Sequence, residues 1–272
     1  MARDLRLAPR SVSELRVMSF NLRWDGMSDG DDGWSHRHAR ATEMLAATTP
    51  DVVGLQEASE AQVEGLVGSM PELAVVGGGA EDGARGGLQT AILFRMDRLE
   101  AQEAGIFWLS DQPGEPGSRT WGNGQPRTCT WARFRDRRNG LRFVVYNTHL
   151  DHRSAAARER GLALLAERVR ATELPAIVMG DLNLEERDAA LRGFLDASRL
   201  RDSLRAVRPE PAADEGTFHG FRGATDGPRV DYVLVPPAAR VRSVETVRRS
   251  VDGRYPSDHF PVLAVVQLDG PR

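Results

Sequence analysis

The feature that most constrains the fold of this chain is a series of short apolar runs, each followed at once by polar residues. The runs are four to six residues long and rich in Val, Ile and Phe, which is typical of buried strands. They are Leu15–Phe20, Val52–Leu55, Thr90–Phe94, Cys129–Phe134, Leu141–Tyr146, Ala176–Met179, Val230–Val235 and Pro261–Val266. Polar side chains that recur at the ends of many strands indicate one active site assembled from those ends.

Helical segments lie between the apolar runs. Apolar residues recur at helical spacing from Val63 to Met70, and Ser59 with Gln62 resembles a capping box at the start of that helix. Further helices are predicted over 36–48, 154–172 and 187–195. Strands and helices are therefore mixed, as in an α/β protein.

A turn and a weak internal repeat indicate how the strands are arranged. Asn139-Gly140 is a strong hairpin signal and implies antiparallel pairing. Two sheets packed face to face, with helices outside, fit this pattern. A strand ending at Asn21 precedes a helix and a second motif at Glu57, and the same order recurs from Asn147 to Asp181. This weak repeat has two explanations: the chain consists of two similar halves with the site between them, or the repeat is coincidence. No linker divides the chain, so we expect one domain over residues 15–272 and an irregular leader over residues 1–14.

Composition excludes several classes of chemistry. All 36 Lys and Arg residues are arginine, which excludes Schiff-base catalysis, pyridoxal phosphate anchoring and a P-loop lysine. Cys129 is the only cysteine, so neither an internal disulfide nor a cysteine zinc cluster is possible. The first 16 residues lack the apolar core of a signal peptide, and no run of 18 apolar residues exists. The cytoplasm is the default location.

Charge and loops bear on the kind of substrate. The net charge is −3 and no long basic run is present, whereas a protein that grips many phosphates usually has a basic stripe. Two long loops over 109–125 and 209–228 are candidates for a functional rim, whereas a plain surface excursion is favoured for the glycine-rich loop 77–87. Trp34, Trp108 and Trp121 are candidates for a pocket wall or for the core, and Trp131 is expected in the core.

Oxygen ligands follow several of the strands. Glu57 and Asn21 offer one charged and one neutral hard oxygen donor, which suits Mg²⁺ or Mn²⁺ ions that keep several waters. Asp258 is placed to ligate the same ion from the other side. The sequence therefore predicts one divalent metal site at Asn21, Glu57 and Asp258.

Further polar residues have the types that phosphoester hydrolysis needs. Asp181 and Asn183 point the same way at a strand end and can hold and align one water molecule. Charge that develops on phosphoryl oxygens would be stabilised by His149, His259 and Asn147. Asp231 is expected to orient His259 and raise its pKa. Each residue alone has a structural explanation, such as a turn, a helix start or an ordinary ion pair.

The motifs taken together resemble the endonuclease/exonuclease/phosphatase superfamily, which includes deoxyribonuclease I, abasic-site endonucleases, inositol polyphosphate 5-phosphatases, sphingomyelinases and deadenylases. The matching stretches are Ser19–Asn21, Gly54–Glu57, Asn147–Leu150, Gly180–Asn183, Val230–Tyr232 and Ser257–Pro261. The resemblance runs from Met18 to about Val266 and implies a four-layer α/β/β/α sandwich of two mostly antiparallel sheets. It also implies the metal, water-handling and acid–histidine roles given above.

Other stretches resemble a bacterial branch of metal-dependent hydrolases. They contain Arg127, His152, Arg158 and His219, which we expect to line a rim that binds and selects the substrate. That branch often has a glutamate where this chain aligns Leu88, beside Gln89. If this alignment holds, an acid near His149 is missing, and the charge environment of His149 differs from that in the branch.

These inferences predict a Mg²⁺- or Mn²⁺-dependent phosphoesterase that uses in-line attack of activated water. The acidic balance favours a small phosphomonoester or phosphodiester as substrate, and a nuclease acting on DNA or RNA is the alternative. A binding protein on a decayed hydrolase fold is a third possibility, which the intact set of motifs argues against. No membrane partner is expected, and a monomer is the default.

Overall fold

The computed structural model describes residues 13–270. The predicted irregular leader falls almost entirely on residues 1–12, which lie outside the described residues.

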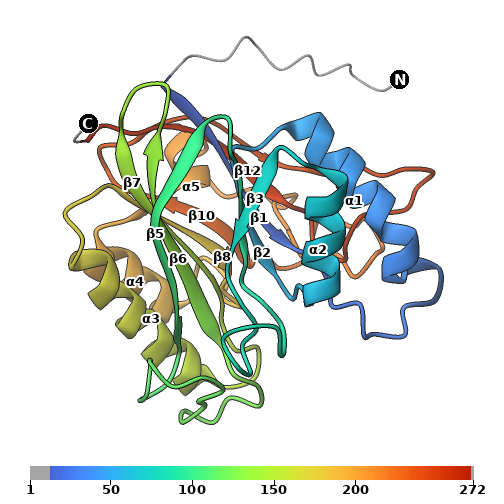
Figure 1. The fold of residues 1–272 in the computed structure, drawn as a ribbon, viewed down its shortest axis with the longest axis horizontal. Helices are drawn as coiled ribbons and strands as arrows, with labels where there is room; N and C mark the ends of the chain where they lie inside the picture. The colour runs from blue at the N-terminus through green and yellow to red at the C-terminus, as the bar shows by residue number, and fades with distance from the viewer. Residues whose placement is uncertain (1–12, 271–272) are drawn as a thin grey trace.

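Two six-stranded sheets pack face to face (Figure 1). The first has the order β11-β12-β1-β2-β4-β3 and the second the order β5-β6-β7-β8-β10-β9. The first sheet comprises β1 (Glu14–Asn21), β2 (Val52–Gln56), β3 (Leu73–Val76), β4 (Ile92–Arg95), β11 (Arg240–Thr246) and β12 (Val262–Gln267). The second comprises β5 (Leu99–Trp108), β6 (Thr128–Asp136), β7 (Arg142–His149), β8 (Ala176–Asp181), β9 (Arg201–Asp202) and β10 (Asp231–Val235).

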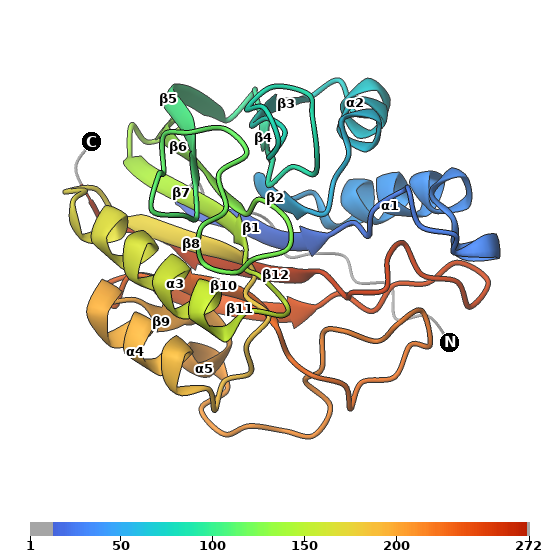
Figure 2. The same cartoon turned by 90° about the horizontal axis from the view of Figure 1, so that it is seen from below.

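Helices cover the two outer faces of this pair of sheets. The helices α1 (Trp34–Thr48) and α2 (Glu60–Ser69) pack on the first sheet, and α3 (Ala155–Arg170) and α4 (Ala189–Ser198) pack on the second. Figure 2 shows both helix pairs outside the sheets. The short α5 (Ser203–Val207) and the 3-10 turn η1 (Gly30–Asp32) complete the helices of the described chain. The predicted α/β/β/α sandwich is therefore confirmed.

The core consists of three apolar layers, as this arrangement requires. The middle layer lies between the sheets and includes Val17, Phe134 and Ile177. The two outer layers join each sheet to its helices, for example through Leu45 of α1 and Leu165 of α3. Strands buried on both faces read as continuous apolar runs, which is why the central strands were predictable from the sequence.

The two sheets repeat one pattern of strand directions. In each sheet one parallel pair, β1–β2 or β7–β8, is joined through a helix, and every other neighbouring pair is antiparallel. The weak internal repeat noted in the sequence corresponds to these two strand–helix–strand units. The hairpin at Asn139-Gly140 joins the antiparallel strands β6 and β7, as predicted.

All eight predicted strands and all four predicted helices are present, with ends displaced by a few residues. The capping box of α2 is formed by Ser59 and Gln62. The sequence analysis missed α5 and the strands β3, β5, β9 and β11. These four strands are the edges of the two sheets. An edge strand has one open side, so its sequence is short or polar and lacks the apolar run of a central strand.

A buried ion pair cluster holds the two sheets together away from the strand ends that carry the motifs. Arg98 donates to Asp51 at 2.7 Å and to Asp136 at 2.9 and 3.1 Å, and all three side chains are fully buried. Asp51 precedes β2 of the first sheet and Asp136 ends β6 of the second.

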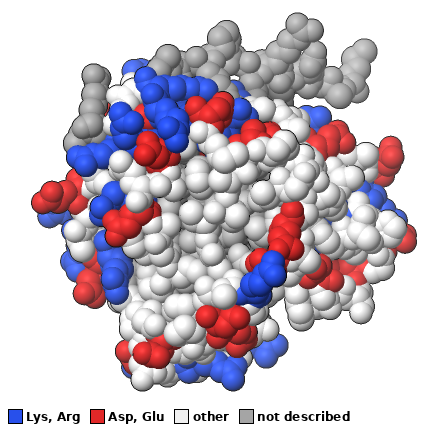
Figure 3. Space-filling view, in the orientation of Figure 1, with Lys and Arg blue, Asp and Glu red and all other residues white. Residues whose placement is uncertain are grey.

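Surface charge is distributed in small mixed groups. On the face shown in Figure 3, arginines and carboxylates lie close to one another around a wide uncharged centre, and no continuous basic stripe crosses it. The arginines of the β6–β7 hairpin follow this rule, since Arg133 pairs with Glu103 and both Arg135 and Arg137 pair with Glu100. Among the described residues, no helix is long and apolar enough to cross a membrane.

Candidate active site

Strand direction brings the polar motifs to one end of the sandwich. The strands β1, β2, β7 and β8 all finish at this end, and β10 and β12 start there because they run antiparallel to β8 and β1. Asp231 therefore lies opposite Asp181, which lies beside His149. Residues near both ends of the described chain, such as Arg23 and Asp258, meet here because of sheet topology.

Asn21 links the acids of the two sheets. Its amide nitrogen lies 3.3 Å from Glu57 Oε1 and 3.1 Å from Asp181 Oδ2. Its amide oxygen accepts a hydrogen bond of 2.9 Å from the backbone N–H of Arg23. Asn21 is fully buried, so these bonds fix the separation of the two carboxylates.

Two residues of the site have left-handed backbone conformations. Glu57 has φ 53° and Asn183 has φ 48°. This region is common for Asn but costly for Glu, on the order of 1–3 kcal/mol. Strain of this kind persists where the surrounding structure holds a side chain in a required position, which marks Glu57 as such a residue.

His259 forms the predicted pair with Asp231. Its Nδ1 lies 2.8 Å from Asp231 Oδ2, and its Nε2 lies 3.9 Å from Asp181 Oδ2. Burial favours the neutral imidazole, but Asp231, Asp181 and Asp258 outweigh it and raise the pKa of His259 to about 10. The imidazolium form of His259 therefore points its Nε2–H toward the centre of the site.

Asp181 is set up to exchange a proton near neutral pH. Burial and the nearby charge of Asp231 raise its pKa to about 7, against the opposing effect of His259. Its Oδ1 accepts from the backbone N–H of Asn183 at 2.9 Å. A carboxylate with this pKa is well matched to the role of a general base.

His149 is held neutral by burial and by a neighbouring arginine. Its Nδ1 lies 3.0 Å from a guanidinium nitrogen of Arg127, and its Nε2 lies 3.0 Å from Asn183 Nδ2 and 3.5 Å from Asp181 Oδ2. Arginine can only donate, so Nδ1 accepts and the ring proton resides on Nε2. Asn183 Nδ2 is also a donor, so Asn183 accepts from this N–H only if its amide turns to present its oxygen. Burial, followed by the charge of Arg127, lowers the pKa of His149 well below its usual value. Arg127 thus occupies the ring nitrogen that faces away from Asp181.

The three residues predicted to bind a metal lie at the same end of the sandwich, with one difference in orientation. Burial raises the pKa of Asp258, and the nearby charge of Glu57 adds to the effect against His259 and Arg23. A buried carboxylate such as Asp258, whose charge is disfavoured by a neighbouring carboxylate, fits a divalent cation, whose charge would relieve the repulsion. Asn21 presents its nitrogen to Glu57, so its predicted role as an oxygen ligand requires the amide to turn.

A second group with metal-ligand chemistry comprises Asp181, Asp231 and His259, whose ligand atoms all lie within 4.8 Å of one another. His259 Nδ1 in this group is already bonded to Asp231. The acid–histidine pair explains this group more fully than direct ligation does. Arg23, which the sequence analysis missed, lies 3.6 Å from Asp258 and also pairs with Asp29.

Asn147 differs from the prediction. Its side chain is fully buried and bonds to the first sheet, donating to Leu55 O and Ala91 O and accepting from Gln56 Nε2 at 2.7 Å. With these bonds made, the amide is engaged between the sheets and does not face a substrate. Gly54 permits the approach, since a Cβ there would lie 2.5 Å from Asn147 Oδ1.

The four predicted rim residues do not lie together. Arg127 lies 3.1 Å from His152 Nδ1 and 3.7 Å from Asp151. Arg127 and His152 are therefore both at the edge of the site. Arg158 donates to Asp151 O at 2.9 Å and braces the loop. His219 is buried and stacks on Phe260 with ring centroids 3.8 Å apart, which is inconsistent with a place on an exposed rim.

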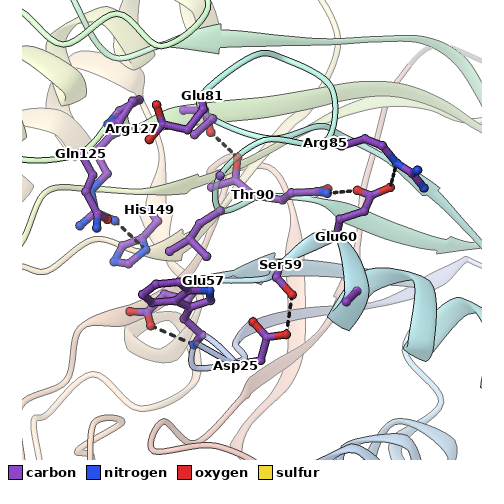
Figure 4. Close-up of a pocket in the computed structure, with 18 residues that line it drawn as sticks. Asp25, Glu57, Ser59, Glu60, Glu81, Arg85, Thr90, Gln125, Arg127 and His149 are labelled. Carbon is purple, nitrogen blue, oxygen red and sulfur yellow. Dashed lines mark hydrogen bonds and ion pairs between the residues drawn. The ribbon is translucent and has the colours of Figure 1, made fainter. Parts of the chain in front are cut away.

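A cavity of about 480 Å³ opens beside Glu57, His149 and Arg127. Figure 4 shows these residues on one side of it and the pair Glu60–Arg85 on the other. Its wall includes Ala80, Glu81, Arg85 and Gly87, so the loop 77–87 borders the candidate site, and the prediction of a plain surface excursion is wrong.

Of the two places left open for Trp34, Trp108 and Trp121, a pocket wall or the core, the cavity wall is taken by none of them, and Trp108 lies in the core. Trp24, which the sequence analysis did not single out, lines the cavity, whereas Trp34, Trp108 and Trp121 do not. Trp108 is buried and donates from its indole to Ala80 O, which anchors the loop 77–87. Trp131 is half-buried on the outer face of the second sheet, so the expectation of a core position is met only in part.

Comparison with known proteins gives consistent results. The profile of the endonuclease/exonuclease/phosphatase family matches residues 18–259. A protein of this family from Bacteroides thetaiotaomicron is 32% identical, with a TM-score of 0.87 over 94% of this chain and 98% of that one. A mannosyl-6-phosphatase from Bacteroides thetaiotaomicron is 31% identical, with a TM-score of 0.86 over 93% of this chain and 100% of that one.

A more distant structure shares the fold alone. The TDP2 protein of D. rerio, solved with a single-strand DNA product, is 20% identical, with a TM-score of 0.75 over 94% of this chain and 100% of that one. The search of the curated proteins returned no match.

Proposed function

The chain belongs to the endonuclease/exonuclease/phosphatase family, and from this premise we propose that it is a divalent-metal-dependent hydrolase of small phosphomonoesters or phosphodiesters. The observation that carries the proposal is the set of bonds that joins the acids and histidines of both sheets. Asn21 connects Glu57 to Asp181, and Asp231 holds His259 with its Nε2–H toward Asp181. A decayed site would have lost part of this set.

Asp181 and Asn183 handle the attacking water in this proposal. Asp181 accepts the proton of the water, since a carboxylate with a pKa of about 7 is both ionised and basic enough near neutral pH. Asn183 is held by the bond from its backbone N–H to Asp181 Oδ1 and keeps the water in line with the scissile bond. No covalent intermediate with the enzyme is needed.

The two histidines stabilise charge that develops on the phosphoryl oxygens. His259 does so as an imidazolium, and His149 does so through the N–H on its Nε2. Donors fixed before the reaction lower the barrier because they need no reorganisation. Glu57 and Asp258, with Asn21 beside them, would hold Mg²⁺ or Mn²⁺. Such an ion, when bound, polarises the phosphoryl group and stabilises the leaving oxygen.

A small substrate is favoured over nucleic acid. The relative that is 31% identical is a mannosyl-6-phosphatase, whereas the relative solved with DNA is too distant to support more than the fold. Mixed surface charge without a basic stripe on the face in Figure 3 agrees with this preference.

The decisive experiment is a screen with Mg²⁺ or Mn²⁺ against phosphomonoesters, phosphodiesters, nucleotides, and single- and double-stranded nucleic acids. Hydrolysis of small esters well above that of nucleic acids is expected. Turnover confined to nucleic acid would replace this proposal with a nuclease.

Metal binding can be tested separately by calorimetry. Glu57→Ala removes a carboxylate that we assign to the ion, so the affinity for Mg²⁺ or Mn²⁺ should fall at least about tenfold, which corresponds to about 1.4 kcal/mol. Glu43→Ala, on the exposed side of α1, is the matched control and should bind as the wild type does. Equal affinity of Glu57→Ala and the wild type would exclude Glu57 from the metal site.

A further inference from the structure

The cavity beside the site has walls whose chemistry identifies the part of the substrate that is not phosphate. We propose that it receives an uncharged, polyhydroxylated group, such as the ring of a sugar monophosphate, and that Glu60 and Trp24 select this group. This inference rests on the proposed function, because it assumes that the phosphate lies at Glu57, His149 and Arg127. The volume of about 480 Å³ is within the range of small-molecule pockets, roughly 300–1,000 Å³.

Charge in the cavity is unfavourable for a second phosphate. Away from the site, the lining carries three carboxylates, Asp25, Glu60 and Glu81, and one cation, Arg85. Arg85 is already paired with Glu60 at 3.1 Å and also with Glu64. A polyanion would therefore meet excess negative charge at this end, and a nucleotide polyphosphate or a sugar bisphosphate is disfavoured.

The same groups are suited to hydroxyls. A carboxylate accepts up to about four hydrogen bonds, so Glu60 keeps free acceptor positions after bonding Arg85 and Gln89. Both partners fix its orientation at the start of α2, which makes it a preorganised acceptor. Gln125, also in the lining, makes no side-chain hydrogen bond within the described chain.

The loop that forms one wall is held in place, so the cavity is a built feature. Trp108 bonds Ala80 O, and the backbone N–H of Gln89 bonds Ala58 O at 2.8 Å. Arg85 ties the tip of this loop to α2. The walls therefore keep their positions relative to Glu57.

Trp24 supplies an apolar surface at the cavity mouth. Trp24 is 38% exposed as a whole residue, and its backbone N–H donates to Glu57 Oε2 at 3.3 Å. The ring lies across Gly26, where a Cβ would be 2.4 Å from it. A ring fixed in this way can stack on the C–H face of a sugar. An ammonium group is a poorer fit, because cation recognition usually uses a cage of several aromatic rings and Trp24 is the one Trp, Tyr or Phe in this lining.

Steady-state kinetics with Mg²⁺ or Mn²⁺ test the inference. The substrates are glucose 6-phosphate, mannose 6-phosphate, fructose 1,6-bisphosphate, AMP, phosphocholine and p-nitrophenyl phosphate. For the wild type we expect the highest kcat/KM with a hexose 6-phosphate. In Glu60→Gln and in Trp24→Ala, the ratio of kcat/KM for that sugar to kcat/KM for p-nitrophenyl phosphate should fall about tenfold, mainly through KM. Glu64→Gln is the matched control, because Glu64 shares Arg85 but does not line the cavity, and it should keep the wild-type ratio.

The outcomes separate this inference from the proposed function. Hydrolysis of p-nitrophenyl phosphate or AMP without preference for a hexose 6-phosphate overturns the inference and leaves the phosphoesterase standing. A preference for phosphocholine or fructose 1,6-bisphosphate also overturns it. An equal fall of the ratio in Glu64→Gln shows that loop anchoring, not recognition by Glu60, is responsible, and rejects the assignment. Loss of all hydrolysis by the metal-supplemented wild type would reject the proposed function and, with it, this inference.

Discussion

At the scale of single residues, the direction of each hydrogen bond decides what the site can do. Arg127 forces His149 to carry its proton on Nε2, and Asp231 gives His259 a proton on the nitrogen that faces Asp181. Both histidines therefore point an Nε2–H toward Asp181, His149 as a neutral ring and His259 as a cation. The sequence analysis expected Asp231 to raise the pKa of His259, but it did not predict the neutral state of His149, because nothing in the motifs places Arg127 against that ring.

Asp181 provides the most direct test at this scale. Asp181→Asn keeps the size of the side chain but removes the base, so turnover should fall by roughly 10²-fold or more, the scale of a lost general base. Circular dichroism should show an unchanged fold. Asp196→Asn, on the exposed face of α4, is the control and should retain full turnover. Near-normal turnover of Asp181→Asn would remove Asp181 from this role.

The raised pKa of His259 predicts how stability depends on pH in metal-free protein. The folded state holds a proton up to about pH 10, whereas the unfolded state releases it near its ordinary value of 6.5. This contribution is therefore complete below pH 6.5 and is lost as pH rises through about 10. The free energy of unfolding, measured with urea from pH 7 to 10, should decline with pH.

Asp231→Asn removes the main partner that raises this pKa, so its stability should decline less over the same range. His36→Gln, an exposed position on α1, should keep the wild-type slope. An unchanged slope in Asp231→Asn would contradict the assignment of the proton to this pair.

At the scale of elements, the sequence predicted the inside of each sheet and missed its borders. Central strands are apolar on both faces and stand out, whereas β5 and β11 are polar edge strands and β3 and β9 are short. Asn147 was misjudged for a related reason. Its position beside the His149 motif suggested a role toward substrate, but only the packing of the two sheets shows that its side chain meets Gly54 and Gln56.

Arg98 is the element-scale position with the largest expected effect on stability. Arg98→Ala leaves Asp51 and Asp136 buried without their shared cation, so the free energy of unfolding should fall by about 3–5 kcal/mol. Arg95→Ala is the control, because its pair with Asp97 is partly exposed and worth at most about 1 kcal/mol. Similar urea midpoints for the two variants would show that the buried cluster does not hold the sheets together.

At the scale of the whole molecule, the site belongs to neither sheet alone. Glu57 and Asp258 come from the first sheet, and Asp181 and His149 from the second. The sequence indicated this arrangement through its repeated order of strand and motif. The cavity beside the site was not predictable, since its walls come from loops and from α2, whose relative placement depends on the finished sandwich.

Salt dependence is a whole-molecule test of the substrate class. A nuclease releases counterions from the nucleic acid when it binds. For each phosphate contacted, the logarithm of its affinity therefore falls by about 0.9 for every tenfold increase in salt concentration. With a net charge of −3 and a small ester as substrate, kcat/KM should change only mildly between 50 and 200 mM salt, roughly the range over which DNA binders lose most affinity. A steep decline would favour the nuclease.

The order of the strands also has a consequence for synthesis. The second sheet is built from the continuous segment from β5 to β10, whereas the first needs β1 to β4 and then β11 and β12 from the other end of the described chain. On the ribosome, the middle segment can emerge and pair while the first sheet still lacks β12, the strand that joins β11 to β1. Asp258 and His259 arrive with that strand. A nascent chain therefore lacks the complete candidate site until the first sheet closes.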